Sequence, residues 1–391
     1  MPIKTMNDLN LQGKTVVVRQ DLNVPMKDGK ITNDKRIRAA FPTLQLALDK
    51  GAGVIVLSHL GRPVEGQYDE QFSLKPVAAR LEELLKREVP VVRELAEARV
   101  SPGQCVLLEN IRFFKGETKN DQTLAAALAK LGDVYVMDAF GAAHRAHSST
   151  EGAVRLAAQA CAGPLMAAEL AAFDKVLDKP RRPLAAVIGG SKVSTKLALL
   201  NNLLDKVDAL IVGGGIANTF LAAAGYAVGT SLCENDLIGE AKKIMERAKA
   251  LGKQLPLPVD VVTAPALAPG QKAVTRKAEA TPADEMILDI GPETVALYAQ
   301  LLDKAATVVW NGPVGAFETY PFGAGTKALA GALADSKAFV VVGGGDSVAA
   351  VESYGLEDKM GYISTGGGAS LELLEGKILP SVAALEARGC D

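Results

Sequence analysis

Short apolar runs alternate with longer helical patterns along almost the whole chain, and this alternation constrains the fold more than any other feature. The runs are rich in valine and isoleucine and lack strict polar alternation, as is typical of strands buried on both faces of a parallel sheet. Strands that alternate with helices predict an α/β fold, with helices on both faces of each sheet. We expect strands at 16–19, 54–59, 106–109, 134–138, 185–188, 209–212, 286–290, 307–310, 339–342 and 362–364.

The chain is too long for a single core of the usual size. At 391 residues it exceeds the length at which single cores stop growing, so two domains are expected. A helix with one apolar face is predicted over 165–180, where Lys179 and Pro180 would end it. We interpret it as a hinge helix between an N-terminal domain, 1–168, and a C-terminal domain, 169–372. Each domain should hold a mostly parallel, Rossmann-like sheet flanked by helices.

Composition and charge narrow the functional class. Hydrophobic residues make up 48% and charged residues 23%, which is typical of a soluble globular protein. A net charge of −2 gives no electrostatic basis for a nucleic-acid or membrane partner. The first residues lack an apolar signal core and no apolar run approaches the ~20 residues of a membrane helix, so we expect a cytoplasmic protein. We interpret the four cysteines as reduced thiols, because Cys105, Cys161, Cys233 and Cys390 form no CxxC pair.

Histidines and glycine pairs lie on opposite sides of the predicted connecting helix. His59, His144 and His147 precede it, whereas every Gly-Gly pair, beginning with Gly189-Gly190, follows it. Backbone N–H groups of glycine runs can approach phosphates closely, and clusters of arginine and histidine bind small anions. The distribution indicates one site for a small acid and another for a polyphosphate. Phosphoryl transfer between two substrates held on two domains is the activity that this division favours.

Polar and cationic residues follow the expected strands of the first domain. Ligands of open α/β sheets bind at the carboxyl ends of the strands, where arginine forks match carboxylate and phosphate oxygens. These residues therefore predict a pocket for a ligand with more than one negative charge. Surface ion pairs for the arginines, and a buried structural role for His59, are the alternatives. The candidates are Arg19, Asp21, Asn23, Arg36, Arg38, His59, Arg62, Arg112, His144 and Arg145.

Glycine-rich segments follow the strands of the second domain. In 189–196 (GGSKVSTK) the spacing of Lys192 and Lys196 predicts one turn of a helix, with both ammonium groups near one phosphate region. The segment is not a Walker A loop, because Thr195 stands where the second glycine is required. The segments 213–218 and 343–348 lack the last glycine of G-x-G-x-x-G, which disfavours an NAD-linked oxidoreductase.

Acidic residues and a third glycine run complete the second site. Asp346 could hold Mg²⁺ that bridges nucleotide phosphates, or could instead cap a helix. Glu318 could bind ribose hydroxyls, or be a solvated surface residue. The glycines at 366–368 lead from an expected strand into a helix, whose N-terminus can face the charge on a moving phosphoryl group.

The ordered set of segments resembles the phosphoglycerate kinase family over nearly the whole chain. The resemblance implies a two-domain α/β monomer with hinge-bending closure, whose C-terminal tail, 373–391, returns to the first domain. It implies reversible phosphoryl transfer, with Mg²⁺, between 1,3-bisphosphoglycerate and ADP to give 3-phosphoglycerate and ATP, as in glycolysis and gluconeogenesis. The segments are 17–25 (VVRQDLNVP), 31–37 (ITNDKRI), 58–63 (SHLGRP), 108–113 (LENIRF), 138–147 (DAFGAAHRAH), 189–196, 213–220 (GGGIANTF), 289–294 (DIGPET), 310–318 (WNGPVGAFE), 343–347 (GGGDS) and 364–380.

The resemblance also implies a role for each matching residue. The phosphoglycerate site would comprise Asp21, Asn23, Arg36, His59, Arg62, Arg112 and Arg145. The nucleotide site would comprise Lys196, Gly213, Asn311, Glu318, Gly344, Gly345, Asp346 and Ser347, with Asp346 at the metal. The phosphoryl group in flight would be stabilised by Arg36, Lys192, Lys196 and the backbone of Gly366 and Gly367. A catalytically inactive nucleotide-binding scaffold of the same fold is the remaining alternative, which the intact charged residues disfavour.

Overall fold

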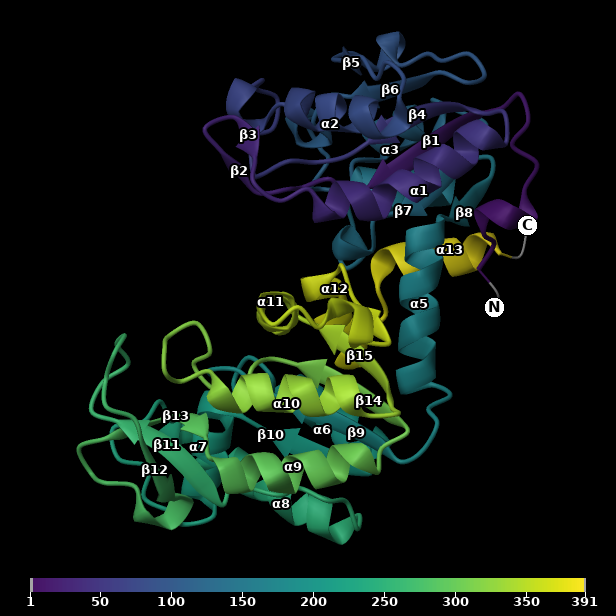
Figure 1. The fold of residues 1–391 in the computed structure, drawn as a ribbon. Helices are drawn as coiled ribbons and strands as arrows, with labels where there is room; N and C mark the ends of the chain where they lie inside the picture. The colour runs from purple at the N-terminus through teal and green to yellow at the C-terminus, as the bar shows by residue number, and fades with distance from the viewer. Residues whose placement is uncertain (1–2, 390–391) are drawn as a thin grey trace. The chain divides into compact units, whose positions relative to one another are not determined.

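A computed structural model describes residues 3–389 of the chain, which fall into two compact units (Figure 1). Unit 1 holds the chain up to Leu170 and again from Ile378 onward, and unit 2 is Ala171–Lys377. The division falls within helix α5 (Pro164–Leu177), which ends three residues before the predicted limit of 180. It ends there because the amides of Asp178 and Lys179 both turn back to the carbonyl of Asp174. Cys390 lies outside the described residues.

Unit 1 is built around a six-stranded sheet in the order β5-β6-β4-β1-β7-β8, in which every pair is parallel. Its strands are β1 (Thr15–Gln20), β4 (Gly53–Leu57), β5 (Val91–Val92), β6 (Cys105–Leu108), β7 (Val134–Asp138) and β8 (Ala160–Ala162), with a hairpin of β2 (Met26–Lys27) and β3 (Lys30–Ile31). Its α-helices, besides α5, are α1 (Lys35–Asp49), α2 (Lys75–Leu85), α3 (Gln122–Ala129), α4 (Ala153–Leu156) and α13 (Pro380–Arg388). Short helical turns are η1 (Met6–Asp8), η2 (Glu70–Phe72), η3 (Leu95–Glu97), η4 (Ile111–Phe113), η5 (Phe140–Ala142) and η6 (Ser148–Gly152).

The core of unit 1 follows from the apolar periodicity of its elements. The three valines of β1 and the aliphatic residues of β4 are fully buried, as expected for central strands covered on both faces. Helix α1 packs on this sheet with Ile37, Leu44 and Leu48, which share one helical face. The rigid sheet that results presents the ends of β1, β4, β6 and β7 at a common edge.

Unit 2 contains a five-stranded parallel sheet in the order β10-β9-β14-β15-β16. Its strands are β9 (Leu184–Ile188), β10 (Ala209–Val212), β14 (Thr307–Asn311), β15 (Phe339–Gly343) and β16 (Tyr362–Ile363). Its α-helices are α6 (Leu197–Lys206), α7 (Gly214–Ala223), α8 (Ile238–Ala250), α9 (Pro292–Asp303), α10 (Ala324–Asp335), α11 (Gly345–Ser353) and α12 (Gly367–Leu374), and its short turns are η7 (Asn235–Leu237), η8 (Ala278–Ala280) and η9 (Glu357–Lys359). The α/β class with mostly parallel sheets is therefore confirmed.

A second sheet in unit 2 differs from the expectation. Strands β11 (Asp260–Ala264), β12 (Val274–Lys277) and β13 (Met286–Ile290) form an antiparallel sheet with β11 in the middle. The prediction of a strand over 286–290 is correct, but its assignment to a parallel sheet is wrong. The first three residues of β13 are only partly buried, because this small sheet is covered less completely than the central one.

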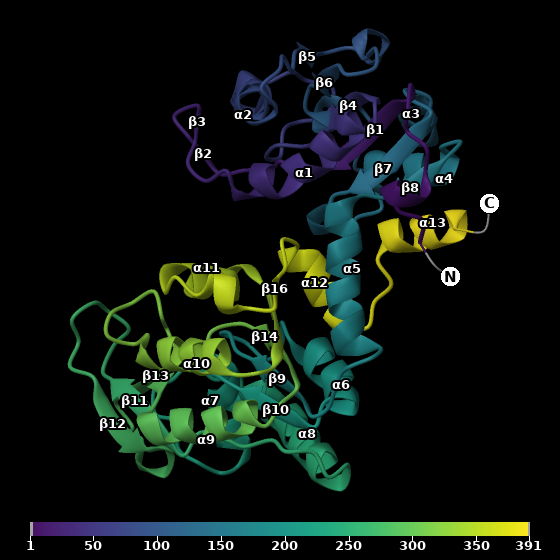
Figure 2. The same cartoon turned by 45° about the vertical axis from the view of Figure 1, so that its right-hand side comes forward.

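The C-terminal helix α13 belongs to unit 1, although it is separated from the rest of that unit by some two hundred residues of sequence. It lies beside β8 in both ribbon views (Figures 1 and 2) and also contacts α4. The guanidinium of Arg388 donates to the carbonyl of Ala157 at 2.8 Å, and the amide of Ser381 donates to the carbonyl of Ala143 at 3.2 Å. The second contact supports the loop that carries Arg145.

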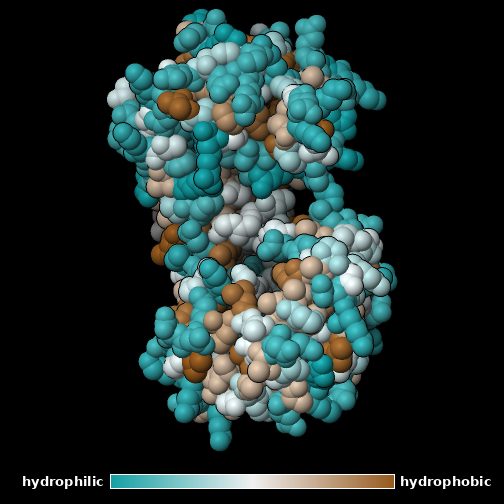
Figure 3. Space-filling model, turned by 90° about the vertical axis from the view of Figure 1, so that its left-hand side faces the viewer, coloured by the Kyte–Doolittle hydropathy of each residue, from teal (hydrophilic) through white to brown (hydrophobic). Residues whose placement is uncertain are grey.

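On the face shown in Figure 3, the surface is mostly hydrophilic, with hydrophobic side chains in small separate patches. Among the described residues, no helix is both long and apolar enough to cross a membrane.

Candidate functional site

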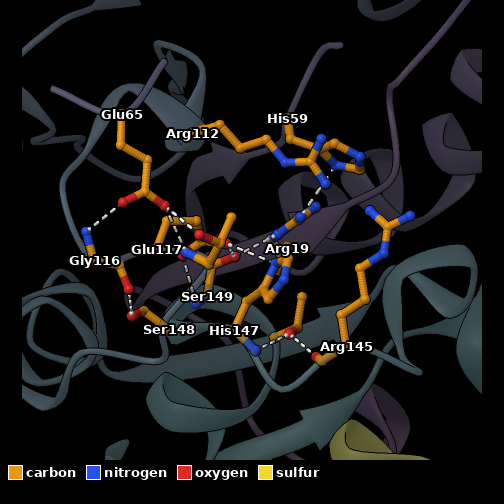
Figure 4. Close-up of polar contacts among 12 residues, drawn as sticks. Arg19, His59, Glu65, Arg112, Gly116, Glu117, Arg145, His147, Ser148 and Ser149 are labelled. Atoms are coloured by element: carbon orange, nitrogen blue, oxygen red, sulfur yellow. Dashed lines mark hydrogen bonds and ion pairs between the residues drawn. The ribbon is translucent and has the colours of Figure 1, made fainter. Parts of the chain in front are cut away.

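The polar residues predicted for the first site follow four strands of one parallel sheet. Asp21 and Asn23 follow β1, His59 follows β4, Arg112 lies in η4 after β6, and Arg145 lies beyond β7. Because β4, β1 and β7 are neighbours in the sheet, their carboxyl ends meet at one edge. The structure therefore brings these residues together, as Figure 4 shows for His59, Arg112 and Arg145.

Arg19, at the end of β1, lies at the centre of this cluster and is only 1% exposed. Its Nε donates to the hydroxyl of Ser149 at 2.8 Å, and its Nη2 lies 3.3 Å from Nδ1 of His59. Its Nη1 donates to the backbone carbonyl of Gln20. A buried guanidinium with this many hydrogen-bond partners is held in one position. Arg19 is therefore a fixed positive charge beneath the site and not a mobile side chain.

The cluster has a strongly positive field. Burial lowers the pKa of His59 well below its ordinary value, and the charges of Arg19, Arg112, Arg145 and Arg36 lower it further. Burial, with Arg145, Arg19 and Arg62 nearby, lowers the pKa of Arg112 to about 10. His59 is therefore neutral near pH 7, while the arginines supply the charge that would attract an anion.

Asp21, Asn23 and Arg36 form a connected group at the edge of the cluster. Nη1 of Arg36 lies 3.1 Å from the carboxylate of Asp21 and donates to the carbonyl of Asn23 at 3.0 Å. The amide oxygen of Asn23 accepts from the backbone N–H of Gly61 at 2.9 Å, and Nη1 of Arg112 donates to the carbonyl of Gly61. These bonds join the loops after β1, β4 and β6 into one frame.

Two residues of the predicted cluster have other partners. Arg38 is exposed and forms an ion pair with Asp34 at 2.6 Å, so the surface-pair alternative is correct for this arginine. Nε2 of His144 lies 3.2 Å from Nε of Arg145, which leaves His144 beside the site residue rather than facing a ligand in its place. The difference between Arg36 and Arg38 arises because they point from different faces of the first turn of α1.

Glu117 and Ser149 lie behind the cluster and were not singled out from the sequence, and they lie near His147, which was noted only as one of the three histidines. Glu117 is fully buried and holds Ser149 through two hydrogen bonds, while Nδ1 of His147 lies 3.8 Å from its carboxylate. Burial, together with Arg112, Arg19 and Arg145, lowers the pKa of His147 to about 4. A glutamate in a loop gives no signal in the sequence that it is buried. Glu117 meets Ser149 only because the loop before α3 packs on η6 in the folded structure.

In unit 2, two glycines of the glycine runs allow backbone segments to pack closely against each other. A Cβ on Gly189 would lie 1.9 Å from the carbonyl oxygen of Pro313, and the amide of Gly189 donates to the carbonyl of Asn311 at 3.0 Å. The loops after β9 and β14 therefore touch backbone to backbone. Gly213 likewise has the side chain of Val314 at 2.4 Å from its Cβ position. Close packing of the strand ends explains these two glycines without any ligand.

A cavity of about 320 Å³ opens at this edge of unit 2. Val261, Met286 and Leu288 contribute apolar walls, whereas Glu318 and Asp346 contribute carboxylates. A mostly apolar cleft with a few polar groups is typical of a small-molecule site. Glu318 and Asp346 are both exposed and line the same cavity.

Asp289 also lines this cavity and was not predicted. Its carboxylate accepts from the amides of Gly325 at 2.7 Å and Ile290 at 2.9 Å. Burial raises the pKa of Asp289 to about 7, and these hydrogen bonds only partly oppose the shift. Its neighbours Gly315 and Gly325 leave room for the carboxylate, because a Cβ on either would come within 2.4 Å of it.

Lys196 and Asn311 form a second polar group beside the cavity. Nζ of Lys196 donates to the amide oxygen of Asn311, whose own NH₂ group is buried without a partner. Gly344, at φ 88°, lies against this NH₂ group, since its Cβ would be 3.0 Å away. The hydroxyl of Ser347, in the first turn of α11, accepts from the amide of Gly312 at 2.5 Å. An unpaired buried donor beside a cation favours an anionic ligand here.

One local prediction for this site is wrong, and one alternative is ruled out. Lys192 and Lys196 do not share a helical turn, because α6 begins only at Leu197 and the preceding segment is an irregular loop. Glu234 holds that loop, accepting from the amide and hydroxyl of Ser194 at 2.8 and 2.6 Å. Asp346 does not cap α11, because the cap position is Gly344 and Asp346 lies within the first turn.

Gly366 and Gly367 lie where a strand passes into a helix, as predicted. Gly366 is the cap residue of α12, which begins at Gly367, so the free amides of the first turn belong to glycines and Ala369. A helix N-terminus with no side chains over it can approach an anion closely.

The residues present fit a magnesium ion that is shared with a nucleotide. Asp346 is exposed at the cavity, and its charge acts on Lys196, which places a carboxylate beside the expected phosphate region. Mg²⁺ in nucleotide sites is bound by one or two carboxylates together with phosphate oxygens and water. Within residues 3–389 the structure contains no group of three or more histidine, cysteine, aspartate or glutamate side chains that could hold a metal ion.

Unit 1 carries an arginine cluster at the edge of its parallel sheet, and unit 2 carries a cavity bounded by glycine loops. These features define a class of protein, namely α/β proteins that bind anionic small molecules. The chain matches the family model of phosphoglycerate kinase over residues 6–377. It is 74% identical over 388 residues to the phosphoglycerate kinase of Desulfovibrio desulfuricans, covering 99% of this chain and 100% of that protein. It is 58% identical to that of Nitratidesulfovibrio vulgaris, with 99% of each chain covered.

Solved structures of phosphoglycerate kinases have the same fold as this chain. The structure of phosphoglycerate kinase from Coxiella burnetii superposes with a TM-score of 0.96 at 53% identity, covering 99% of this chain and 100% of that one. The phosphoglycerate kinase from Pyrococcus horikoshii OT3 gives a TM-score of 0.84 at 32% identity, with 99% of each chain covered. The chain belongs to the phosphoglycerate kinase family.

Proposed function

We propose that this chain catalyses reversible phosphoryl transfer between 1,3-bisphosphoglycerate and ADP, giving 3-phosphoglycerate and ATP. The observation that carries the proposal is the convergence of Arg19, Arg36, Arg112 and Arg145 on the neutral ring of His59. Several arginines around an uncharged donor suit a small ligand with both a phosphate and a carboxylate. The family to which the chain belongs is a family of phosphotransferases that act on such a ligand.

The phosphoglycerate would bind in unit 1. Asp21 and Asn23 supply acceptors for its hydroxyl, and His59 donates a hydrogen bond. The arginines hold its phosphate and carboxylate oxygens by bidentate contacts. These ligands would be Asp21, Asn23, Arg36, His59, Arg62, Arg112 and Arg145. Because the pKa of His59 is held well below its ordinary value, it acts as a ligand and not as a general base.

The nucleotide would bind in unit 2. The apolar walls of the 320 Å³ cavity take the base, and Glu318 takes the ribose hydroxyls. The phosphates would meet Lys196, the NH₂ group of Asn311 and the start of α11. The residues assigned to this site are Lys196, Gly213, Asn311, Glu318, Gly344, Gly345, Asp346 and Ser347. Asp346 would hold Mg²⁺, which neutralises phosphate charge when bound.

The transfer step needs positioning and charge neutralisation rather than a proton acceptor. The attacking or leaving group of the acid is a carboxylate, which is ionised at neutral pH because its pKa is near ~4. Arg36, Lys192, Lys196 and the amides at Gly366 and Gly367 would neutralise the phosphoryl group as charge builds on its oxygens. Lys192 is exposed on an irregular loop, so it can move toward the phosphate during the reaction.

Substrates bound to separate units must meet for transfer to occur. The reacting oxygens need to come within ~3–3.5 Å, so we infer closure about a hinge, with α5 and the segment 371–380 as its candidates. The N-terminal domain, 1–168 together with the tail from 373, and the C-terminal domain, 169–372, would each move as one body. X-ray scattering should give a smaller radius of gyration with both substrates bound than without. Superimposable profiles would refute closure.

We further infer that the protein is a cytoplasmic monomer. Cys105, Cys161 and Cys233 are free thiols, which fits a reducing compartment. Sedimentation at micromolar concentration should give the mass of one 40.8 kDa chain.

The deciding experiment is coupled turnover of 3-phosphoglycerate with MgATP, comparing the wild type with Lys196→Ala. Turnover in the wild type and a loss of about 10²–10³-fold in the variant would support the kinase and its phosphate site. Wild-type protein that binds MgADP but does not turn over would support the inactive scaffold instead. Turnover of NADH, followed by absorbance, would be required to revive the NAD-linked alternative.

A further inference from the structure

A buried chain of hydrogen bonds lies behind the arginine cluster of unit 1 and ends on His59 (Figure 4). It begins at Glu117, which is 0% exposed and accepts from the Ser149 hydroxyl at 2.6 Å and from the Ser149 amide at 3.0 Å. The same hydroxyl accepts from Nε of Arg19 at 2.8 Å. Nη2 of Arg19 lies 3.3 Å from Nδ1 of His59.

The donors and acceptors of this chain fix its direction. Arginine can only donate, so the Ser149 hydroxyl must receive Nε–H of Arg19 on a lone pair and give its one proton to Glu117. For the same reason, the contact between Arg19 and His59 requires a lone pair on Nδ1. A neutral imidazole carries one N–H, so the proton of His59 must be on Nε2.

The charges around His59 favour the neutral ring. Arg19 from β1, Arg36 from α1, Arg112 from η4 and Arg145 from the loop after η5 all act against a positive charge on it, in addition to burial. A neutral ring donating from Nε2 can bind a carboxylate or hydroxyl without adding a proton to the ligand. Binding is then insensitive to the titration of His59 over the physiological range.

Glu117 supplies the negative charge that this arrangement needs. Both of its oxygens accept hydrogen bonds from Ser149, as suits an ionised carboxylate. Burial raises the pKa of Glu117, whereas the charges of Arg19 and Arg112 and the bonds from Ser149 oppose the shift. The buried guanidinium of Arg19 would otherwise be compensated only by neutral oxygens.

We propose that Glu117 is a positioning residue for the phosphoglycerate site, acting through Ser149 and Arg19 to hold His59 as the neutral tautomer with its proton on Nε2. Glu117 and Ser149 touch no substrate in this scheme. The proposal rests on the proposed function for its kinetic consequence, but the tautomer of His59 is a property of the free protein. It can therefore be tested separately.

The first test is nuclear magnetic resonance of protein labelled with ¹⁵N at histidine. Only three histidines contribute, and His59→Asn identifies the signals of His59 by their loss. Long-range ¹H–¹⁵N correlations should show an unprotonated Nδ1 and a protonated Nε2, unchanged from pH 8 to pH 5.5. A protonated Nδ1 of His59, or titration of its ring near its ordinary pKa, would overturn the proposal, and this result would not depend on whether Glu117→Gln or Ser149→Ala folds.

The second test uses Glu117→Gln and Ser149→Ala, with Tyr135→Phe as the matched control. Tyr135 donates to the carbonyl of Ser149 at 2.6 Å, so its loss loosens the same turn but leaves the chain to His59 intact. Both chain variants should alter the His59 spectrum and raise KM for 3-phosphoglycerate about tenfold, equivalent to about 1.4 kcal/mol, with KM for MgATP changed less than about twofold. Tyr135→Phe should lower the melting temperature but leave the His59 spectrum and KM for 3-phosphoglycerate unchanged.

The outcomes separate the two claims. Chain variants with the wild-type spectrum and KM, or a Tyr135→Phe variant that changes both as they do, would refute the positioning role. The expected tautomer in a protein without turnover would leave the positioning of His59 standing and refute the proposed function.

Discussion

At the scale of single residues, the charge of Lys196 is sensitive to pH near neutrality and just above it. Burial lowers its pKa to about 8, while the charges of Asp346 and Glu375 only partly restore it. Below that pH the ammonium is present to attract phosphate, and above it the charge is lost. ADP affinity, measured by calorimetry at constant Mg²⁺, should be constant from pH 6.5 to 7.5 and then fall by up to about tenfold per pH unit above 8.

Lys196→Arg is the control for this pH dependence, because a guanidinium keeps its charge at every accessible pH. The variant should bind ADP more weakly but with a flat profile above pH 8. A flat profile in the wild type would contradict the assignment of Lys196 to the phosphates.

Arg36 and Arg38 provide a matched pair on the first turn of α1. Arg36 contacts Asp21 and Asn23 at the site, whereas Arg38 pairs with Asp34 on the surface. Arg36→Ala should lower kcat by about 10²–10³-fold, because one donor to the charge of the transition state is lost, with the Kd of MgADP changed less than about twofold. Arg38→Ala should change neither. An unchanged kcat in Arg36→Ala would remove its proposed role in transfer.

At the scale of elements, the loops after β9 and β14 are held together by glycine backbone. A Cβ on Gly189 would lie 1.9 Å from a carbonyl oxygen that cannot rotate away. Gly189→Ala should therefore cost about 3 kcal/mol of unfolding free energy, measured by urea denaturation. Gly331→Ala in α10 is the control, because no atom lies within 4 Å of its Cβ position. It should stabilise the helix by about 0.5–1 kcal/mol. Equal midpoints for the two variants would contradict this packing.

Element boundaries show where the local pattern was sufficient. Strands at 134–138, 209–212 and 286–290 were predicted to the residue, because continuous apolar runs mark buried strands. Strands β5, β8, β11 and β12 were not predicted. Strands β5 and β8 have only two and three residues, and polar residues interrupt the apolar runs of β11 and β12. The irregular loop before α6 was taken for helix because its spacing is helical, although the bonds of Ser194 to Glu234 hold it otherwise.

At the scale of the whole molecule, the C-terminal helix completes unit 1. Leu379 and Leu385 are buried there, and the amide of Ser381 holds the carbonyl of Ala143, two residues before Arg145. Ending the chain after Lys377 should lower the melting temperature and raise KM for 3-phosphoglycerate several-fold, with a smaller effect on KM for MgATP. Ending it after Gly389 is the control and should change little. A shortened chain with the wild-type KM would show that the tail does not support the site.

The amino-acid sequence by itself determined the α/β class, the order of most strands and the family. These follow from the local hydrophobic pattern and from short motifs, which can be recognised without knowledge of the tertiary packing. Only the tertiary structure decided which charged groups meet. Arg19 and Ser149 are 130 residues apart, Lys196 and Asn311 are 115 apart, and no local pattern connects either pair. Burial then set the pKa values of His59 and Lys196, because a group loses its hydration only when distant segments close over it.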